Sequence, residues 1–211
     1  MKKQVTEKRG IRLQDVLLIA MIGLIFSIVY MLVLNLGMAL QVALTPLGLG
    51  VLAFEIVYGI WFMAATVAAS IIRKPLVAFS AEFLAAVLEL LLGNPGGMMV
   101  VITGLIQGAG GELGYLLFGY KKWRLGAAIL SAITSALVTM LQTLYIGGYA
   151  GLSPGMILAM LGVRIASAVF FTGVVGYGLT QGLARTGVLR SYPIGQELAA
   201  DKDVDLDEDD L

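Results

Sequence analysis

Six long apolar stretches alternate with short polar segments along this chain. They cover about residues 16–36, 50–72, 76–92, 98–119, 125–146 and 155–179. Each has the length of about 17–25 residues that an α-helix needs to cross the hydrocarbon core of a bilayer. The pattern therefore predicts an all-α integral membrane protein, a bundle of six transmembrane helices in a single membrane domain over residues 16–184.

Two polar segments flank this domain. Residues 1–15 are basic, and residues 185–211 end in the acidic run DKDVDLDEDDL. The first apolar stretch is longer than that of a cleaved signal peptide, so we expect it to be retained as a helix. Eight of the 14 acidic residues follow Tyr192, and this acidic tail is predicted to be disordered.

Lys and Arg residues are distributed unevenly among the loops. They precede the first stretch and recur in the segments after the second, fourth and sixth, as at Arg73 and Lys74. The loops after the first, third and fifth stretches contain no Lys or Arg. Because basic loops stay on the cytoplasmic side, both termini are predicted to be cytoplasmic, in a multi-pass protein of the cell membrane.

Composition narrows the classes of function. The chain is 59% hydrophobic and 13% charged, and it has no Cys and no His. This excludes disulfides, thiol catalysis, zinc sites built on Cys or His, and a Ser-His-Asp triad. No GxxxxGK[ST] phosphate loop occurs either. We accordingly expect no catalytic residue, no metal site, no cofactor and no nucleic-acid partner.

Five charged residues lie within the apolar stretches. A carboxylate in hydrocarbon is tolerated only where it faces a protein interior or a wet cavity, so each of these positions is a candidate for function. Glu82 and Glu89 are seven residues apart, close to two helical turns, so both project from one face of the predicted helix. We expect the acids to line a pocket for a small cationic or amine-bearing solute. The five residues are Glu55, Glu82, Glu89, Glu112 and Arg164.

Each of these charges has an alternative explanation. A buried carboxylate can accept an interhelical hydrogen bond from Ser, Thr or Gln without touching any ligand. Arg164 can pair with Glu55 or Glu112 and so serve the fold alone. Phosphorylated ligands are disfavoured in either case, because Arg164 is the only basic residue within the stretches.

Aromatic and amide side chains accompany the acids. Tyr58 is three residues from both Glu55 and Trp61, so the three share much of one helix face. Aromatic faces attract cations by about 0.5–2 kcal/mol, although Tyr and Trp near a span end are also typical interface residues. Three candidates for the pocket remain, one on the fourth stretch (Gln107) and two in charge-free loops (Asn94 and Tyr149).

A small-residue stripe marks the first stretch. Ala20, Gly23 and Ser27 recur at helical spacing, which suits close contact with another helix. The partner is either a helix of another subunit or one of this protein's own bundle.

Several runs resemble the YkoE family. They are FEIVYGIWF (Phe54–Phe62), RKP (Arg73–Pro75), EFLAAVLELLLGNPGG (Glu82–Gly97), the Gln107–Glu112 segment, and GGYAGLSPG (Gly147–Gly155) leading to Arg164. The similarity covers about Val16–Leu189. It implies the fold of a substrate-binding S component of an energy-coupling-factor (ECF) transporter in the bacterial plasma membrane, with thiamine or its hydroxymethylpyrimidine (HMP) precursor as the ligand.

The resemblance also implies partners and roles. A transmembrane coupling protein (T component) and ABC-type ATPase subunits are expected as partners. S components contact the T component through small residues of the first helix, where this chain has Ala20, Gly23 and Ser27. We expect Glu82 and Glu89 to contact the ligand's aminopyrimidine or thiazolium. The rings of the ligand are expected to stack on Tyr58, Trp61 and Tyr149. Its other polar groups are expected to contact Asn94, Gln107 and Glu112.

Two other classes of function remain open. A stand-alone secondary transporter of a small cationic solute would use the intramembrane carboxylates as proton relays. Such carriers often show inverted halves with broken helices, and no convincing repeat is visible in this sequence. An intramembrane enzyme would have to work with acids alone. The sequence does not separate thiamine from HMP.

Overall fold

The fold is described for residues 10–200 of a computed structural model. Within this range every regular element is helical. Short 3₁₀ segments (η1–η4) and one π-helical segment (η5) interrupt or join the α-helices. The elements are α1 (Leu13–Leu44), η1 (Thr45–Leu47), η2 (Gly50–Leu52), α2 (Ala53–Val57), η3 (Tyr58–Phe62), α3 (Met63–Ile72), α4 (Val77–Leu91), α5 (Met98–Leu117), α6 (Leu125–Tyr145), η4 (Tyr149–Gly151), α7 (Pro154–Ser167), η5 (Ala168–Gly176) and α8 (Tyr177–Arg185).

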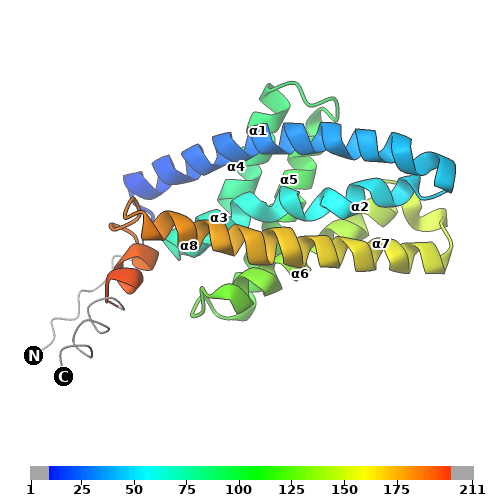
Figure 1. The fold of residues 1–211 in the computed structure, drawn as a ribbon. Helices are drawn as coiled ribbons and strands as arrows, with labels where there is room; N and C mark the ends of the chain where they lie inside the picture. The colour runs from blue at the N-terminus through cyan, green and yellow to red at the C-terminus, as the bar shows by residue number, and fades with distance from the viewer. Residues whose placement is uncertain (1–9, 201–211) are drawn as a thin grey trace, which may run out of the picture.

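The helices form one bundle (Figure 1). The long helix α1 lies along one side in this view and the continuous run α7–η5–α8 along the other, with α2, η3 and α3 between them. Helix α5 packs between α4 and α6 and completes the bundle. The hydroxyl of Tyr192 donates a hydrogen bond to the carbonyl of Gln14 (3.0 Å), so the C-terminal segment meets the beginning of α1 at one end of the bundle.

The predicted all-α membrane architecture is confirmed. In the described part of the chain, five helical runs are long and apolar enough to cross a membrane. The expected third span corresponds to α4, which has 15 residues and is shorter than the roughly 20 that span a bilayer. The six-span count and the orientation therefore stay predictions. The five runs are Leu13–Leu47, Gly50–Ile72, Met98–Leu117, Leu125–Tyr145 and Pro154–Arg185.

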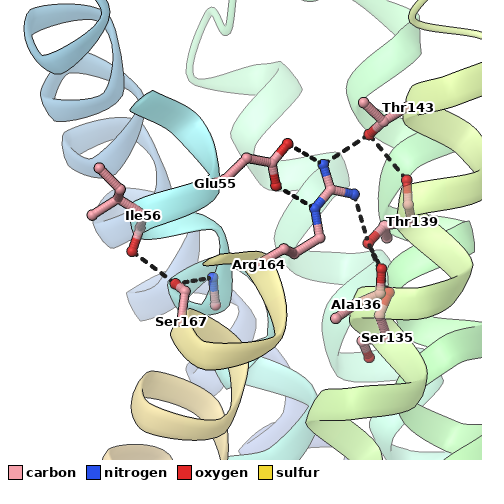
Figure 2. A network of polar contacts seen from close by, with 9 residues as sticks. Glu55, Ile56, Ser135, Ala136, Thr139, Thr143, Arg164 and Ser167 are labelled. Carbon is pink, nitrogen blue, oxygen red and sulfur yellow. Dashed lines mark hydrogen bonds and ion pairs between the residues drawn. The ribbon is translucent and has the colours of Figure 1, made fainter. Parts of the chain in front are cut away.

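The second span is broken in its middle by the 3₁₀ segment η3. The break places Gly59 directly against α7, where a Cβ atom would collide with the backbone of Ser167. The Gly59 amide donates to the Ser167 hydroxyl (3.0 Å), which itself donates to the Ile56 carbonyl (2.8 Å; Figure 2). The Thr172 hydroxyl in turn donates to the Gly59 carbonyl. Hydroxyl groups of a neighbouring helix thus satisfy backbone groups that the break leaves free, as lipid could not.

Glycines bring α5 close to both of its neighbours, as their spacing predicts. A Cβ atom on Gly104 or Gly108 would strike α4, at Ala86 and Phe79, whereas one on Gly110 or Gly114 would strike the backbone of α6. Close backbone approach through small residues is how membrane helices associate without a hydrophobic driving force between them. Gly104 and Gly108 therefore form a packing face toward α4, and Gly110 and Gly114 form one toward α6.

Replacing Gly114 with alanine should destabilise the bundle. The added methyl group would lie 2.3 Å from Ser131 Cα, much closer than van der Waals contact allows, and overpacking of this kind costs about 1–3 kcal/mol. Gly162→Ala is the matched control, because Gly162 lies in the exposed face of α7 with no atom within 4 Å of its Cβ position. We expect the melting temperature in detergent to fall for Gly114→Ala and to hold or rise for Gly162→Ala. Equal melting temperatures for the two variants would contradict the contact.

The small-residue stripe on α1 faces mainly inward. Gly23 and Ser27 are buried, and a Cβ atom on Gly23 would lie 3.2 Å from Leu84 Cγ of α4. Of the three residues of the stripe, only Ala20 is exposed. Gly23 and Ser27 are thus covered by this chain's own bundle, the alternative that the sequence left open, and Gly23 packs against α4. A contact of the stripe with the coupling subunit stays a prediction.

The prediction of disorder over residues 185–211 is wrong for the part up to residue 200. Residues 193–200 are helical, and Leu189, Tyr192 and Ile194 are buried against the end of the bundle. Glu197 Oε2 lies 2.6 Å from Nη2 of Arg73, and this hydrogen bond lowers the pKa of the Glu197 carboxyl. The rest of the predicted tail, 201–211, and positions 1–9 of the predicted basic N-terminus lie outside the described residues.

Candidate functional site

A first cavity of about 270 Å³ opens between α1, the second span, α4 and α5. Aromatic side chains form one wall, where Tyr58 packs edge-on against Trp61 at 5.8 Å between ring centroids, and Phe54 lies 6.2 Å from Trp61. Polar groups come from α4, α5 and the loop that joins them. The lining residues are Leu34, Phe54, Tyr58, Trp61, Glu89, Asn94, Gly96, Met99, Val100, Thr103 and Gln107.

Glu89 is held in this cavity by the turn that ends α4. The Asn94 side-chain amide donates to Glu89 Oε1 at 2.6 Å, while its carbonyl oxygen accepts from the Gly96 amide at 2.8 Å. Gly97 adopts φ +58°, a conformation that favours glycine and lets α5 begin directly after the turn. The GNPGG sequence thus builds a rigid corner that orients one carboxylate and one amide toward the same space.

A second cavity, also of about 270 Å³, adjoins the first. Phe54, Tyr58 and Met99 line both cavities and so form the partition between them. The second cavity lies between α2, α6 and α7, close to the loops at one end of the bundle. Its other lining residues are Gln41, Gly50, Val51, Glu55, Gln142, Thr143, Ile146, Gly147, Tyr149 and Arg164.

Arg164 and Glu55 form a bidentate ion pair at the wall of the second cavity (Figure 2). Arg164 Nε lies 2.5 Å from Glu55 Oε2 and Nη2 lies 2.7 Å from Oε1, while Thr143 and Thr139 of α6 accept further hydrogen bonds from the guanidinium at 2.9 and 3.3 Å. The guanidinium carbon also sits 3.9 Å from the Tyr58 ring centroid. The side chain of Arg164 is fully buried. Of the two partners the sequence left open, Arg164 therefore pairs with Glu55.

The two cavities differ in charge. The Glu55–Arg164 pair is neutral as a unit, so the second cavity carries no net charge from its lining residues. Glu89 in the first cavity has no cation within 4 Å among residues 10–200, and its partner there is the neutral Asn94 amide. One uncompensated carboxylate beside three aromatic rings is an arrangement that attracts a cation or an amine.

Two of the four intramembrane acids line neither cavity, contrary to expectation. Glu82 is fully buried, and its Oε2 accepts hydrogen bonds from the Tyr30 hydroxyl and the Ala65 amide, both at 3.1 Å. It thereby holds the beginning of α3 against α1 and α4. Glu112 accepts from the amides of Leu76 and Phe79 at 2.6 and 3.1 Å and caps the first turn of α4. Both acids accept hydrogen bonds from backbone amides of this chain, so the structure gives each a role in the fold, and their contact with a ligand stays a prediction.

The other eight candidates do line the cavities. Trp61, Glu89, Asn94 and Gln107 reach the first, Glu55, Tyr149 and Arg164 the second, and Tyr58 both. Sequence reasoning missed the apolar and hydroxyl residues of the walls. Phe54 could have been predicted, because it directly precedes Glu55 in the run FEIVYGIWF. Met99, Thr103 and Thr143, in contrast, carry no sequence signal that separates them from ordinary span residues.

Comparisons with known proteins agree with this architecture. A family model described as "ABC-type cobalt transport system, permease component" matches residues 14–138. The described residues nevertheless contain no group of three His, Cys, Asp or Glu side chains that could hold a metal ion. The chain is 36% identical over 187 residues to YkoE of Bacillus subtilis (strain 168), a protein whose name describes it as an HMP/thiamine permease. That alignment covers 89% of this chain and 92% of YkoE.

The fold matches a solved structure as closely. The crystal structure of an S-component of an ECF transporter superposes with a TM-score of 0.89 at 34% sequence identity, covering 94% of this chain and 98% of the other. Sequence and fold thus agree over nearly the whole length of both relatives. The chain therefore belongs to the YkoE family and is an S component of an energy-coupling-factor transporter, a multi-pass protein of the bacterial cell membrane.

Proposed function

We propose that this S component captures thiamine or its HMP precursor in the two adjoining cavities and delivers it inward together with an ATPase module. The observation that carries the proposal is the uncompensated carboxylate of Glu89, held by Asn94 beside Tyr58 and Trp61. A carboxylate accepts the N–H donors of an aminopyrimidine or balances a thiazolium charge, and aromatic rings stack on either ring. The name of YkoE points to the same ligands.

The sizes and polarities of the cavities suggest how the ligand is divided between them. Small-molecule pockets measure roughly 300–1,000 Å³, so one cavity of about 270 Å³ suits a single ring and the pair suits a two-ring ligand. In this arrangement Glu89, Asn94 and Gln107 contact the aminopyrimidine. Tyr58 separates the rings, and Tyr149 closes the second cavity. Arg164 is already engaged by Glu55, which favours unphosphorylated ligands.

Loop charges support entry from outside. The cavities lie near the segments 48–50, 94–96 and 147–149, which contain no Lys or Arg. In the six-span orientation with cytoplasmic termini, these segments face the outside. The basic residues Arg73, Lys121 and Lys122 then lie on the inner side, at the opposite end of the bundle.

Transport in this proposal requires partners. The sequence has no phosphate loop of its own, so ATP hydrolysis falls to separate ABC-type ATPases joined through a transmembrane T component. The S component itself performs no covalent chemistry. Large apolar residues are exposed along α1, among them Met21, Ile25 and Leu32, and they provide a surface for lipid or for the T component.

Calorimetric titration of the purified, detergent-solubilised protein tests the proposal. We expect binding of thiamine and HMP without any partner protein, and weaker binding of thiamine phosphates because no free cation lines the cavities among the described residues. Absence of binding for both unphosphorylated ligands, in protein shown to be folded, would overturn the assignment. Uptake of thiamine into proteoliposomes by this chain alone would instead support a secondary carrier.

A further inference from the structure

A third cavity, of about 650 Å³, lies at the opposite end of the bundle from the substrate cavities. It is formed where α5 ends and α6 begins, with Arg73 at the end of α3 and Glu197 of the C-terminal segment on its other side. Neither the proposed substrate site nor the predicted coupling contact uses it. Its lining residues are Arg73, Phe118, Lys121, Lys122, Trp123, Arg124, Gly126, Ala127 and Glu197.

The residues that line this cavity carry a large excess of positive charge. Four basic side chains face a single acid, Glu197, which lies 2.6 Å from Arg73 and 3.6 Å from Arg124. Lys121 and Lys122 form no ion pair within residues 10–200, and Lys122 Nζ instead lies 5.2 Å from the centroid of the Phe118 ring. A positive charge of about three remains for an anion to neutralise.

The loop that carries the two lysines is shaped by aromatic stacking and by two residues with positive φ. Trp123 stacks on Tyr115 at 5.1 Å and on Tyr120 at 6.1 Å between ring centroids. Gly119 and Tyr120 both adopt φ near +60°, which turns the chain sharply after α5. The basic side chains therefore project from a preformed turn, so that an anion binds without first ordering the loop.

The cavity borders an apolar surface at the ends of two spans. Leu116 and Leu117, in the last turn of α5, are 51% and 62% exposed, and Leu125 at the beginning of α6 is 40% exposed. Side chains at span ends lie at the level of the lipid headgroups, so acyl chains can cover these leucines while the headgroup reaches the lysines. Basic pockets between membrane helices on the cytoplasmic side are suited to anionic headgroups.

We propose that the third cavity binds the phosphate-bearing headgroup of an anionic phospholipid. In the orientation predicted from the loop charges, this lipid belongs to the cytoplasmic leaflet. Lys121, Lys122 and Arg124 contact the phosphate, and the exposed leucines of α5 and α6 contact the acyl chains. Bound lipid then links the α5–α6 turn to the C-terminal segment through the Arg73–Glu197–Arg124 contacts.

Two other sources of negative charge compete for this cavity. Inorganic phosphate offers the same oxygens without acyl chains. The acidic residues 201–211 of this chain lie outside the described residues, but they follow Glu197 closely in sequence and carry seven Asp and Glu residues. The experiment must therefore separate a lipid from a free anion and from the chain's own C-terminus.

Quenching of Trp123 fluorescence by brominated lipids tests the proposal. In a Trp61→Phe background, Trp123 is the only tryptophan, and it lines the cavity. The protein is placed in phosphatidylcholine vesicles that contain brominated phosphatidylglycerol or, separately, brominated phosphatidylcholine. We expect phosphatidylglycerol to be preferred, and Lys121→Gln/Lys122→Gln to reduce that preference roughly thirtyfold, as expected for removing two lysines from the membrane surface.

The matched control is Arg185→Gln/Arg190→Gln. It removes two exposed basic residues that do not line the cavity, so it should leave the preference nearly unchanged. An equal loss in both double variants, or no preference in the parent protein, would overturn the proposal. Displacement of the brominated lipid by excess inorganic phosphate would assign the cavity to free anions. A preference that emerges only in a chain ending at residue 200 would assign it to the C-terminus.

Discussion

Arg164→Met is expected to destabilise the folded protein by about 3–5 kcal/mol, the largest effect of any single substitution considered. Removing the guanidinium leaves the buried carboxylate of Glu55 without its two charge-assisted hydrogen bonds, and an uncompensated buried charge carries a penalty of this size. The hydroxyls of Thr139 and Thr143 lose their donor as well. The free energy of unfolding in detergent, from a denaturant titration, measures the effect.

Removing both charges should restore much of this loss. The double variant Arg164→Met/Glu55→Leu replaces the ion pair with apolar groups and leaves no charge to desolvate, and such replacements are often nearly neutral. It should therefore be more stable than either single variant. Arg124→Met is the control for loss of an arginine, because that side chain is 83% exposed and its substitution should change stability by less than about 1 kcal/mol. Additive effects of the two single substitutions would show that Arg164 and Glu55 do not act as a pair.

Sequence reasoning succeeded where local sequence determines the structure. The apolar stretches predicted at 50–72 and 125–146 agree within one residue with the apolar helical runs Gly50–Ile72 and Leu125–Tyr145, because apolar length is a direct requirement of the bilayer. Glycine spacing located both packing faces of α5, since small residues have few other uses at such positions. Apolar length and glycine spacing are both properties of local sequence.

Whether each acid lines a cavity or bonds to the backbone depends on tertiary contacts that local sequence does not encode. Glu82 and Glu89 project from one face of α4, yet seven residues separate them by about 10 Å along the helix axis. Glu89 therefore reaches the cavity near the GNPGG turn, whereas Glu82 lies deep in the bundle at the broken second span, where the Ala65 amide needs an acceptor. The break at η3 coincides with the Gly59 contact with α7, and it precedes the Ala65 amide that Glu82 accepts from.

The C-terminal segment was mispredicted for a different reason. Its many acids suggested a solvated tail, but Leu189, Tyr192 and Ile194 precede all of them and bury their side chains at the end of the bundle. Net charge over a whole segment conceals a short apolar group within it. A residue-by-residue reading of positions 189–194 would have found the signal.

Glu89→Gln should lower the affinity for thiamine by roughly ten- to a hundredfold. Glutamine has nearly the same shape and can still accept from Asn94 through its carbonyl oxygen, so the corner at the end of α4 should keep its geometry. What is lost is the negative charge, and hydrogen bonds to charged groups contribute about 1.5–3 kcal/mol. Calorimetric titration of purified protein in detergent gives the dissociation constants.

Glu112→Gln provides the matched control, because it makes the same change at an intramembrane acid that caps α4 at the other end of the bundle. It should reduce stability by about 1 kcal/mol, the usual cost of a weakened cap, and leave the affinity unchanged. Titration with HMP then locates the contact. A similar loss for HMP and thiamine would place the Glu89 carboxylate at the shared aminopyrimidine, whereas a loss for thiamine alone would place it at the thiazolium. Unchanged affinity for both ligands would remove Glu89 from the site, and with it the observation on which the proposed function rests.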